Sequence, residues 1–323
     1  MADEFYEVRF EVEPNYAGWR LDRYLCEKIP RLSRTRVQEL IKRSVTSDRP
    51  LKPSTLVFAG LRFSLRKKVL EEPPTTDAPA TVLYRDADLV AVDKPAGLPM
   101  HPTARYFKGT LVARLREMAG PGEKLDPAHR IDRETSGIVL CGARPEVTTR
   151  LKHAFAHGQI AKAYLAIVEG APAFESTTID APLSVGGAVV RIKVVVDVEH
   201  GKPAVTEVEV VARYRDQSGA PFALLRAHPR TGRQHQIRAH LSHIGLPLVG
   251  DKIYGPDETL FVRFTEHALD DAAWARLRLE RHALHAAEVA LAHPTTGARL
   301  RIESPLPADL AGFLAGLEPE RAR

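Results

Sequence analysis

The stretch His129–Leu140, HRIDRETSGIVL, is the most informative about the fold, because a run of charged residues is followed directly by a run of apolar residues. The apolar run Ile138–Leu140 predicts a short buried β-strand. Immediately before it, Thr135–Gly137 supplies turn-forming residues. The sequence therefore predicts a loop of charged side chains that is aimed by a turn at the start of a buried strand.

Asp132 is the central side chain of this loop and stands between Arg130 and Arg133. Neighbouring cations lower the pKa of a carboxyl group, so Asp132 is expected to stay ionised and to be available as a nucleophile or base. On charge alone, a salt-bridged surface loop is the simpler interpretation, and the two interpretations stay open at this point.

The composition is that of an ordinary globular protein with a modest basic excess. The 323 residues are 44% hydrophobic, carry a formal net charge of +5 and have a pI near 9.2, which is compatible with a polyanionic partner. Cys26 and Cys141 are too few for a disulfide framework or a cysteine-rich zinc site. No signal-peptide pattern and no apolar run of membrane-spanning length occur, so we expect a cytoplasmic protein that makes no contact with membranes.

The segment 71–80, EEPPTTDAPA, predicts a linker because it is rich in Pro and Thr and poor in large apolar side chains. We accordingly expect a small domain over residues 1–70 and a larger one over residues 81–323. Between Arg31 and Lys68, eleven Lys or Arg face only two acidic residues. A concentration of this kind favours contact with a nucleic-acid backbone over a merely solvated surface.

The first domain is predicted to be a small α+β unit. Leu21, Tyr24 and Leu25 suit a short helix, and Ser33 can cap a second helix. We expect this second helix to contribute basic side chains to an RNA-binding face, and the candidates are Arg34, Arg36 and Arg43.

The larger domain mixes strand and helix signals. Residues 162–170, 206–214 and 222–228 predict strands, and LVARLREMAG, residues 111–120, predicts a helix that ends at its glycine. Long crossover helices between the strands are scarce. We therefore predict an α+β fold with a mixed, mainly antiparallel sheet and helices at its periphery.

A second polar constellation lies within residues 228–255, HPRTGRQHQIRAHLSHIGLPLVGDKIYG. Its apolar residues recur at helical spacing, and Arg238 lies on a different face of that helix, where it could meet a phosphate or a carboxylate such as Asp132. The stretch also contains four histidines, but it has no HExxH pattern and no third carboxylate at metal-binding spacing. A metal site is therefore not expected.

Lys162 and Tyr164 share one face of a predicted strand, since they are two residues apart. A lysine beside a tyrosine suits a pocket for an anionic ligand with a flat ring, although a half-exposed strand face would show the same pattern.

Taken together, these motifs resemble one family. HRIDRETSG closely resembles the HRLDxxTSG signature of the RluA-type pseudouridine synthases. The resemblance continues in the same order through the rest of the larger domain, in VDKPAGLPMHPT, KAYLAIVEG, PRTGRQHQIRAHLSHIGLPLVGDKIYG and RHALHAAEVALAHPTTG. It implies an isomerase that converts uridines of folded RNA into pseudouridine by base flipping, without a cofactor or a metal.

The resemblance also implies roles for individual residues. Asp132 matches the catalytic aspartate, and Tyr164 matches the tyrosine that stacks on the target base and is a candidate proton acceptor at carbon five. Arg238 matches the arginine that pairs with the aspartate, and Arg130 matches the arginine that fills the place of the flipped uridine. A glycal-type route is implied for the reaction. Further substrate contacts are expected from Lys162, His129, Arg233 and Gln236.

The first domain resembles the S-four-type RNA-binding domain, with SVTSDRPLKP, residues 44–53, in place of the usual Asn-Gly turn and longer hairpin. This arrangement is similar to that of members of the family that modify large-subunit ribosomal RNA. We therefore expect ribosomal RNA as the partner and a monomeric protein. Transfer RNA as substrate, a catalytically silent RNA-binding protein and a histidine-dependent metallohydrolase are the alternatives.

Overall fold

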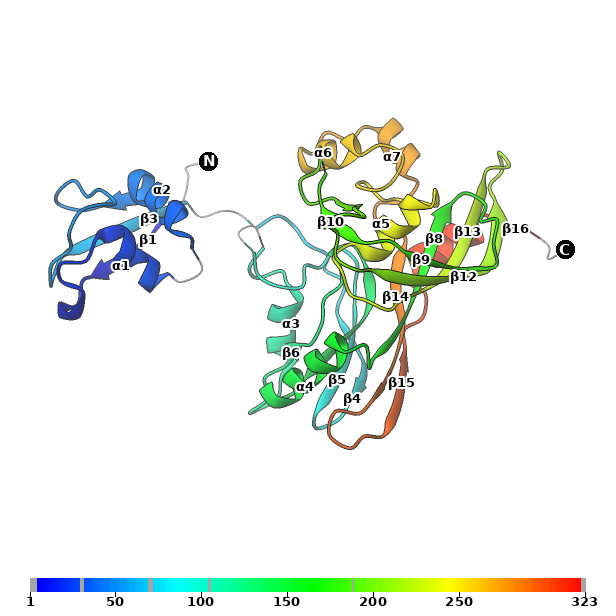
Figure 1. Cartoon of the computed structure of the whole chain (residues 1–323), viewed down its shortest axis with the longest axis horizontal. Coiled ribbons are helices and arrows are strands. Elements are labelled where there is room, and N and C mark those ends of the chain that lie inside the picture. The colour runs from blue at the N-terminus through cyan, green and yellow to red at the C-terminus, as the bar shows by residue number, and fades with distance from the viewer. Residues whose placement is uncertain (1–4, 30–31, 69–71, 104–105, 188, 321–323) are drawn as a thin grey trace. The chain divides into compact units, whose positions relative to one another are not determined.

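The computed structural model describes residues 5–29, 32–68, 72–103, 106–187 and 189–320. The chain divides into two compact units, residues 1–71 and residues 72–323 (Figure 1). Each unit has its own hydrophobic core, and each is described by itself.

The first unit packs two helices on a three-stranded antiparallel sheet of order β1-β3-β2. Its elements are β1 (Phe5–Glu11), α1 (Leu21–Lys28), α2 (Arg34–Ser44), β2 (Val45–Thr46) and β3 (Arg62–Lys68). Both predicted helices are confirmed. The Ser33 side chain accepts a hydrogen bond from the backbone N–H of Arg36, so it caps α2 as expected.

Asp22 is the one fully buried carboxylate among the described residues of the first unit, and it fixes how α1 meets α2. Its Oδ2 accepts hydrogen bonds from Arg34 at 3.2 Å and from Gln38 at 2.8 Å. Arg20 donates to the same carboxylate, and the pKa of Asp22 is held well below its ordinary value. Arg34 is therefore committed to an intramolecular ion pair, although much of its side chain remains exposed.

The second unit is built on an eleven-stranded sheet whose main path runs β16-β12-β13-β8-β14-β7-β5-β4. Strands β15, β6 and β9 pair with β14, β7 and β12 respectively. All pairings within this sheet are antiparallel except the one between β14 and β7. The predicted mixed, mainly antiparallel sheet is thus confirmed.

The strands of this sheet lie as follows. They are β4 (Thr81–Arg85), β5 (Leu89–Lys94), β6 (Asp126–Pro127), β7 (Ser136–Gly142), β8 (Ala161–Glu169), β9 (Ser176–Asp180), β12 (Val205–Arg215), β13 (Pro221–Pro229), β14 (Leu284–Ala292), β15 (Arg299–Glu303) and β16 (Glu318–Pro319). A separate two-stranded hairpin is formed by β10 (Leu183–Val185) and β11 (Val194–Val196).

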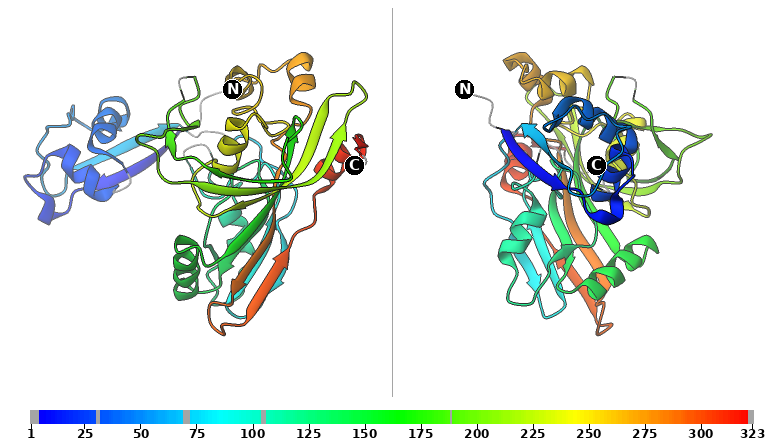
Figure 2. Two further views of the ribbon diagram at one scale, coloured as in Figure 1. Left: turned by 45° about the vertical axis from the view of Figure 1, so that its right-hand side comes forward. Right: turned by 90° about the vertical axis from the view of Figure 1, so that its left-hand side faces the viewer.

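The helices of the second unit flank the sheet, as predicted. They are α3 (Leu111–Met118), α4 (Pro145–Ala156), α5 (Gln236–His243), α6 (Thr259–Thr265), α7 (Asp271–Leu277) and α8 (Ala308–Ala315). Helices α3 and α4 lie toward one end of the unit, and α5, α6 and α7 gather toward the other (Figures 1 and 2). None of the helices in the described ranges is long and apolar enough to cross a membrane.

Gly137 explains why the opening motif organises this unit. It pairs with Ala286 where β7 runs parallel to β14, and its φ is +109°. A Cβ atom at this position would lie 2.2 Å from the carbonyl oxygen of Ala286, a distance that no side chain tolerates. The glycine therefore lets β7 start against the middle of the sheet, which places the preceding loop, residues 128–135, over the sheet.

The segment that we expected to be a linker has no regular secondary structure where it is described, from residue 72 to residue 80. It is nevertheless attached to the second unit. Glu72 accepts hydrogen bonds from the backbone N–H groups of Lys108 and Gly109, and Arg114 donates to the carbonyl oxygens of Thr76 and Ala78.

Candidate active site

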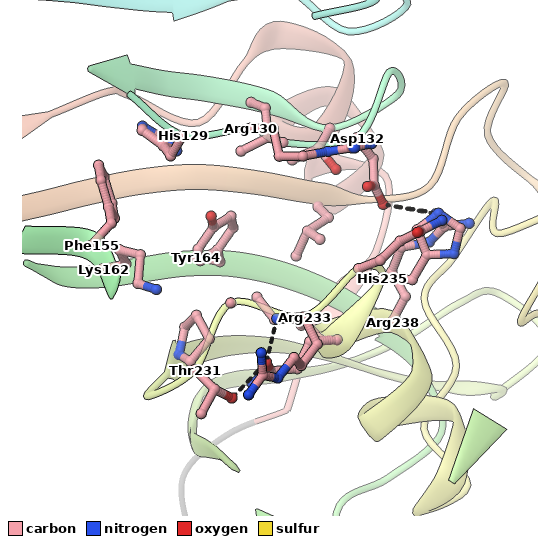
Figure 3. Close-up of a pocket in the computed structure, with 18 of the residues that line it drawn as sticks. His129, Arg130, Asp132, Phe155, Lys162, Tyr164, Thr231, Arg233, His235 and Arg238 are labelled. Atoms are coloured by element: carbon pink, nitrogen blue, oxygen red, sulfur yellow. Dashed lines mark hydrogen bonds and ion pairs between the residues drawn. The ribbon is translucent and has the colours of Figure 1, made fainter. Parts of the chain in front are cut away.

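One cavity of about 530 Å³ in the second unit is lined by residues from the loop before β7, from β8, from α4 and from the loop that leads into α5. All eight residues predicted for catalysis or substrate binding line it: His129, Arg130, Asp132, Lys162, Tyr164, Arg233, Gln236 and Arg238. Figure 3 shows Asp132 at one end beside His235 and Arg238, Lys162 and Phe155 at the other end, and Tyr164 between them. The fold thus brings together residues that lie more than 100 positions apart in the sequence.

Arg238 is buried between two carboxylates. Its Nη1 donates to Asp132 Oδ2 at 2.8 Å, while its Nε and Nη2 donate to the two oxygens of Asp251 at 2.7 and 2.9 Å. The side chain of Asp251 is fully buried, and that of Arg238 is only 6% exposed. A bidentate pair of this kind fixes the plane of the guanidinium group, so Arg238 holds Asp132 in one defined position.

Asp251 was not anticipated from the sequence. Its Oδ1 also accepts hydrogen bonds from the backbone N–H groups of Ile253 and Tyr254, at 2.9 and 3.0 Å. Burial opposes the charge, but Arg238 and these donors outweigh it and depress the pKa of Asp251 strongly. In the sequence, Asp251 is an aspartate thirteen residues after Arg238 that directly follows a glycine. Its position alone does not distinguish it from an ordinary turn residue.

Asp132 remains ionised despite its surroundings. Burial alone would raise its pKa, but the neighbouring charge of Arg238 outweighs burial and holds that pKa below its ordinary value. Its side chain keeps 18% of its surface exposed and lines the cavity. It is the only carboxylate among the residues that line the cavity in the described part of the chain.

His235 lies beside Asp132 and contacts the hydroxyl group of Tyr254. The backbone N–H of Val194 donates to the Tyr254 hydroxyl at 2.8 Å, so that hydroxyl is free to donate its own proton to Nδ1 of His235, 3.0 Å away. We assign the ring proton to Nε2, the nitrogen that lies 3.9 Å from Asp132 Oδ2. His235 adopts φ +54°, a left-handed conformation that is uncommon outside glycine and recurs at functional sites.

Tyr164 occupies the middle of the cavity on β8. Its direct cross-strand neighbours are small, Ala227 on β13 and Ala286 on β14, so the ring has room above the sheet. Burial and the charge of Asp132 both raise the pKa of the phenol, which therefore stays protonated near neutral pH.

At the far end, Lys162, His129 and Phe155 form a group of their own. The backbone N–H of Leu140 donates to Nε2 of His129 at 3.0 Å, so the neutral ring carries its proton on Nδ1. Burial lowers the pKa of His129 to about 3 and also lowers the pKa of Lys162. The rings of His129 and Phe155 lie 4.3 Å apart. Phe155 was not among the predicted residues.

The remaining predicted residues differ in what they offer to a ligand. Gln236 is fully used within the protein: its Oε1 accepts from Thr231 and from the backbone of Arg233, and its Nε2 donates to the backbone of Val205 and to Thr206. It supports the loop before α5. Arg233 donates through Nε to a backbone carbonyl but is exposed at the rim, and Arg130 is exposed as well.

The loop that carries Asp132 is attached from behind by Lys94, whose side chain is completely buried. Its Nζ donates to the carbonyl oxygens of Pro95, Leu98 and Arg133, at 2.9, 3.0 and 3.0 Å. Burial lowers the pKa of Lys94 to about 7, yet three carbonyl acceptors are the complement of an ammonium group with three protons. The hydrogen-bond geometry therefore favours the charged form at neutral pH.

A second support lies next to Asp132. Lys252 is buried and donates to both carboxylate oxygens of Glu134, at 3.2 and 3.1 Å, and it also packs 4.6 Å from the Phe264 ring centroid. Thr135 and Nε2 of His282 lie 2.7 Å apart. Asp132, Glu134 and Thr135 of this loop therefore all have buried partners, so the loop is not a salt-bridged surface turn.

The four histidines of the second motif do not converge. His240 lies in the interior of α5, where its two nitrogens contact Thr206 Oγ1 and the Ala181 carbonyl, each at 2.9 Å. Within the described ranges, no group of three or more His, Cys, Asp or Glu side chains is arranged to hold a metal ion.

Comparison with known proteins agrees with this geometry. A sequence model of the family described as RNA pseudouridylate synthase matches residues 88–243. The chain is 34% identical to ribosomal large subunit pseudouridine synthase D of Pseudomonas aeruginosa, over 98% of this chain and 96% of that one. It is 31% identical to the Haemophilus influenzae protein of the same name, over 96% and 94% of the two chains.

Solved structures have a similar fold. Human RNA pseudouridylate synthase domain containing 4 superposes with a TM-score of 0.58 at 25% identity, over 75% of this chain and 95% of that chain. Human RNA pseudouridylate synthase domain containing 1 gives a TM-score of 0.59 at 24% identity, over 76% and 91% of the two chains. The chain therefore belongs to the RluA-type family of RNA pseudouridine synthases, which are isomerases acting on RNA.

Proposed function

We propose that this protein converts specific uridines of large-subunit ribosomal RNA into pseudouridine, with Asp132 as the catalytic residue. The observation that carries the proposal is one ionised carboxylate in a cavity whose other charged lining residues, within the described part of the chain, are all basic. Arg238 and Asp251 hold that carboxylate in place. The ribosomal assignment is supported by the names of the curated relatives, which cover nearly the whole chain.

The site suits a base that has been flipped out of its stack. Arg130, Arg230 and Arg233 line the cavity, and Arg130 and Arg233 are exposed at its rim, where they can contact the RNA backbone. Tyr164 offers the face of its ring to a flat base deeper in the cavity. Flipping costs a few kcal/mol, which such contacts supply.

The reaction balances without a cofactor. The bond between C1′ and N1 breaks, the detached uracil turns, and a bond between C1′ and C5 forms. The proton that leaves C5 is matched by one that arrives at N1, so the enzyme ends each cycle in its starting protonation state. We assign the acid–base work to Asp132, the only carboxylate lining the cavity in the described part of the chain. Since Tyr164 stays protonated, it can accept the C5 proton only by passing its own proton on in the same step.

Replacing the carboxylate tests this assignment. Asp132→Asn keeps the shape of the side chain and its contact with Arg238, but it removes the charge. We expect the variant to bind RNA with an affinity close to that of the wild type and to form no pseudouridine in single-turnover assays. Turnover at a rate close to that of the wild type would exclude Asp132 as the catalytic residue.

Carbodiimide-based mapping of pseudouridines in total RNA tests the substrate. Cells with and without the gene are compared, and the gene encoding Asp132→Asn serves as a matched control. We expect one or more pseudouridines of the large-subunit ribosomal RNA to disappear in both deficient strains. A loss confined to transfer RNA would replace the ribosomal assignment, and an unchanged map would favour a catalytically silent RNA-binding protein.

The first unit is proposed to be an S-four-type RNA-binding domain, followed by a linker over residues 71–80 and a catalytic domain over residues 81–323. Arg36 and Arg43 support this proposal. Arg36 is mostly exposed beside Glu39, and Arg43 is exposed with no ion pair to any described residue. The double variant Arg36→Ala and Arg43→Ala should weaken RNA binding while the site chemistry stays intact. We also propose that the protein acts as a monomer in the cytoplasm, where its RNA substrate is found.

A further inference from the structure

The end of the cavity opposite Asp132 is built differently from the catalytic end. Lys162 and Tyr164 lie on the same face of β8, because side chains two positions apart on a strand point to the same face. Tyr164 points into the middle of the cavity, and Lys162 lies beyond it beside Phe155 (Figure 3). The proposed function requires the target base to stack on Tyr164 within reach of Asp132, so the space past Tyr164 is left for another part of the RNA.

Lys162 has a charge that the protein does not neutralise. Its ammonium group forms no hydrogen bond and no ion pair with any of the residues that the structure describes, and Asp132 is the only carboxylate lining the described part of the cavity. Its side chain is partly buried, and burial alone accounts for the lowered pKa. Within the described residues, its one contact with an aromatic ring is with Phe155, which carries no charge, so a partly desolvated cation here is best stabilised by an anionic ligand.

Two flat rings and one N–H donor lie at this end of the cavity beside the cation. The ring of Phe155 lies 6.0 Å from Nζ of Lys162, and the ring of His129 lies 4.3 Å from that of Phe155. Because Nε2 of His129 accepts from Leu140, its Nδ1 carries the proton and is available as a donor. Phe155 is anchored on α4 and packs against the core, so its ring is held in place.

We infer that this end of the cavity is a second nucleotide subsite, in which Lys162 binds a phosphate next to the target uridine and Phe155 stacks on the neighbouring nucleotide. The inference rests on the proposed function, since it takes the target uridine to lie on Tyr164. Every base has a flat face, so Phe155 reads the position of the neighbour rather than its identity. The subsite therefore requires the substrate to present two successive unstacked nucleotides.

A double-mutant cycle between protein and RNA tests the subsite. The RNA is a fragment around a mapped target uridine, made with a neutral methylphosphonate at either the 5′ or the 3′ phosphate of that uridine. For one of the two positions, we expect the modification to weaken the wild type roughly tenfold, the loss that a single charge-assisted contact accounts for. Lys162→Met should bind unmodified RNA more weakly by the same factor. It should bind that methylphosphonate RNA no more weakly than it binds unmodified RNA.

Matched variants separate a local contact from general electrostatics. Lys162→Arg keeps the charge and should retain most of the affinity. Lys152→Met removes an exposed lysine that is paired with Asp126, and it should leave both the affinity and the methylphosphonate effect unchanged. Phe155→Leu keeps the apolar volume without the ring, and we expect a roughly tenfold loss of affinity.

Binding is measured in chains that also carry Asp132→Asn, so that the result does not depend on turnover. If the losses from Lys162→Met and from the methylphosphonate multiply at both positions, the phosphate contact does not exist and the inference falls. If the two are coupled in binding but the unmutated chain forms no pseudouridine, the subsite stands and the proposed reaction falls.

Discussion

Arg238 contacts Asp132 with one nitrogen only, and its other two nitrogens are held by Asp251. The arginine is therefore not simply the partner of the catalytic candidate. The buried carboxylate of Asp251 fixes the guanidinium group of Arg238 in place. Asp132 therefore has a positively charged neighbour whose position does not depend on Asp132 itself. This arrangement explains why a largely buried carboxyl group remains ionised.

The first prediction concerns the pH dependence of the reaction when this cation is removed. The pKa of Asp132 in the folded protein lies below its ordinary value. The ionised carboxylate therefore stabilises the fold above the unfolded pKa, and this contribution is lost as pH falls through the folded pKa. The same ionised form is the one that the reaction needs. The wild-type rate should therefore stay constant down to mildly acidic pH. In the double variant Arg238→Met and Asp251→Asn, burial dominates and raises the pKa of Asp132. The rate should then fall toward acidic pH within the range that single-turnover assays can follow.

The second substitution in this variant is needed because Arg238→Met alone would leave Asp251 buried and unpaired, at a cost of about 3–5 kcal/mol. Asn at position 251 can still accept the hydrogen bonds from the backbone of Ile253 and Tyr254. A pH–rate profile for the double variant that coincides with the wild-type profile would show that Arg238 does not control the ionisation of Asp132.

The sequence predicted the sheet well because its signals are local. Residues 162–170, 206–214 and 222–228 are runs bounded by turn residues, and they form β8, β12 and β13. Their order in the sheet is not local. The parallel approach of β14 to β7 depends on Gly137 meeting Ala286, a contact between residues nearly 150 positions apart.

The side chains were predictable only in part. Spacing predicted that Arg238 lies on a helix, but an exposed arginine would have had the same spacing. The folded chain shows that Arg238 is buried, because it pairs with the buried Asp251. Arg34 illustrates the opposite case. Its charge predicted an RNA contact, whereas packing of α1 against α2 engages it with Asp22, which sequence patterns do not reveal.

The second prediction is that His235 acts as a positioning residue through the proton on Nε2. The 3.9 Å between Nε2 and Asp132 Oδ2 is longer than a hydrogen bond, and such contacts often shorten in the substrate complex. Gln carries an N–H donor near the place of Nε2, and Asn carries one near the place of Nδ1. We expect His235→Gln to stay within about threefold of wild-type kcat and His235→Asn to lose about 10–100-fold, with KM little changed in both, as expected for one hydrogen bond to a charged group.

Backbone strain cannot produce this order of effects, because Asn tolerates the left-handed φ of +54° better than Gln does. Nitrogen-15 NMR of the wild-type ring should show the proton on Nε2 and none on Nδ1. If the Asn variant proves to be the more active of the two, the hydrogen bond from Nε2 is not what positions Asp132.

The third prediction concerns Lys94, which ties the Asp132 loop to the turn after β5. Lys94→Met keeps the length and the apolar stem of the side chain but leaves three carbonyl groups without their donor. We expect the free energy of unfolding of the second unit to fall by about 2–4 kcal/mol, as estimated for lost buried hydrogen bonds to a charged group. Denaturant titration measures this loss, and Lys152→Met, an exposed lysine, should change the stability by less than about 1 kcal/mol. Equal stability of Lys94→Met and the wild type would mean that the loop does not depend on the lysine.

The last prediction separates the two roles that the family resemblance implies for Tyr164, stacking on the base and accepting a proton. Tyr164→Phe keeps the ring between Ala227 and Ala286 but removes the hydroxyl group, whereas Tyr164→Leu removes the ring as well. If the phenol oxygen takes part in moving the C5 proton, Tyr164→Phe should bind RNA within about threefold of the wild type and lose about 10²–10⁴-fold in the single-turnover rate, the range expected for general acid–base catalysis. Tyr164→Leu should lose affinity in addition. A Phe variant that turns over within tenfold of the wild type would restrict Tyr164 to stacking, and the proton would then have to pass directly to Asp132, the only carboxylate lining the cavity in the described part of the chain.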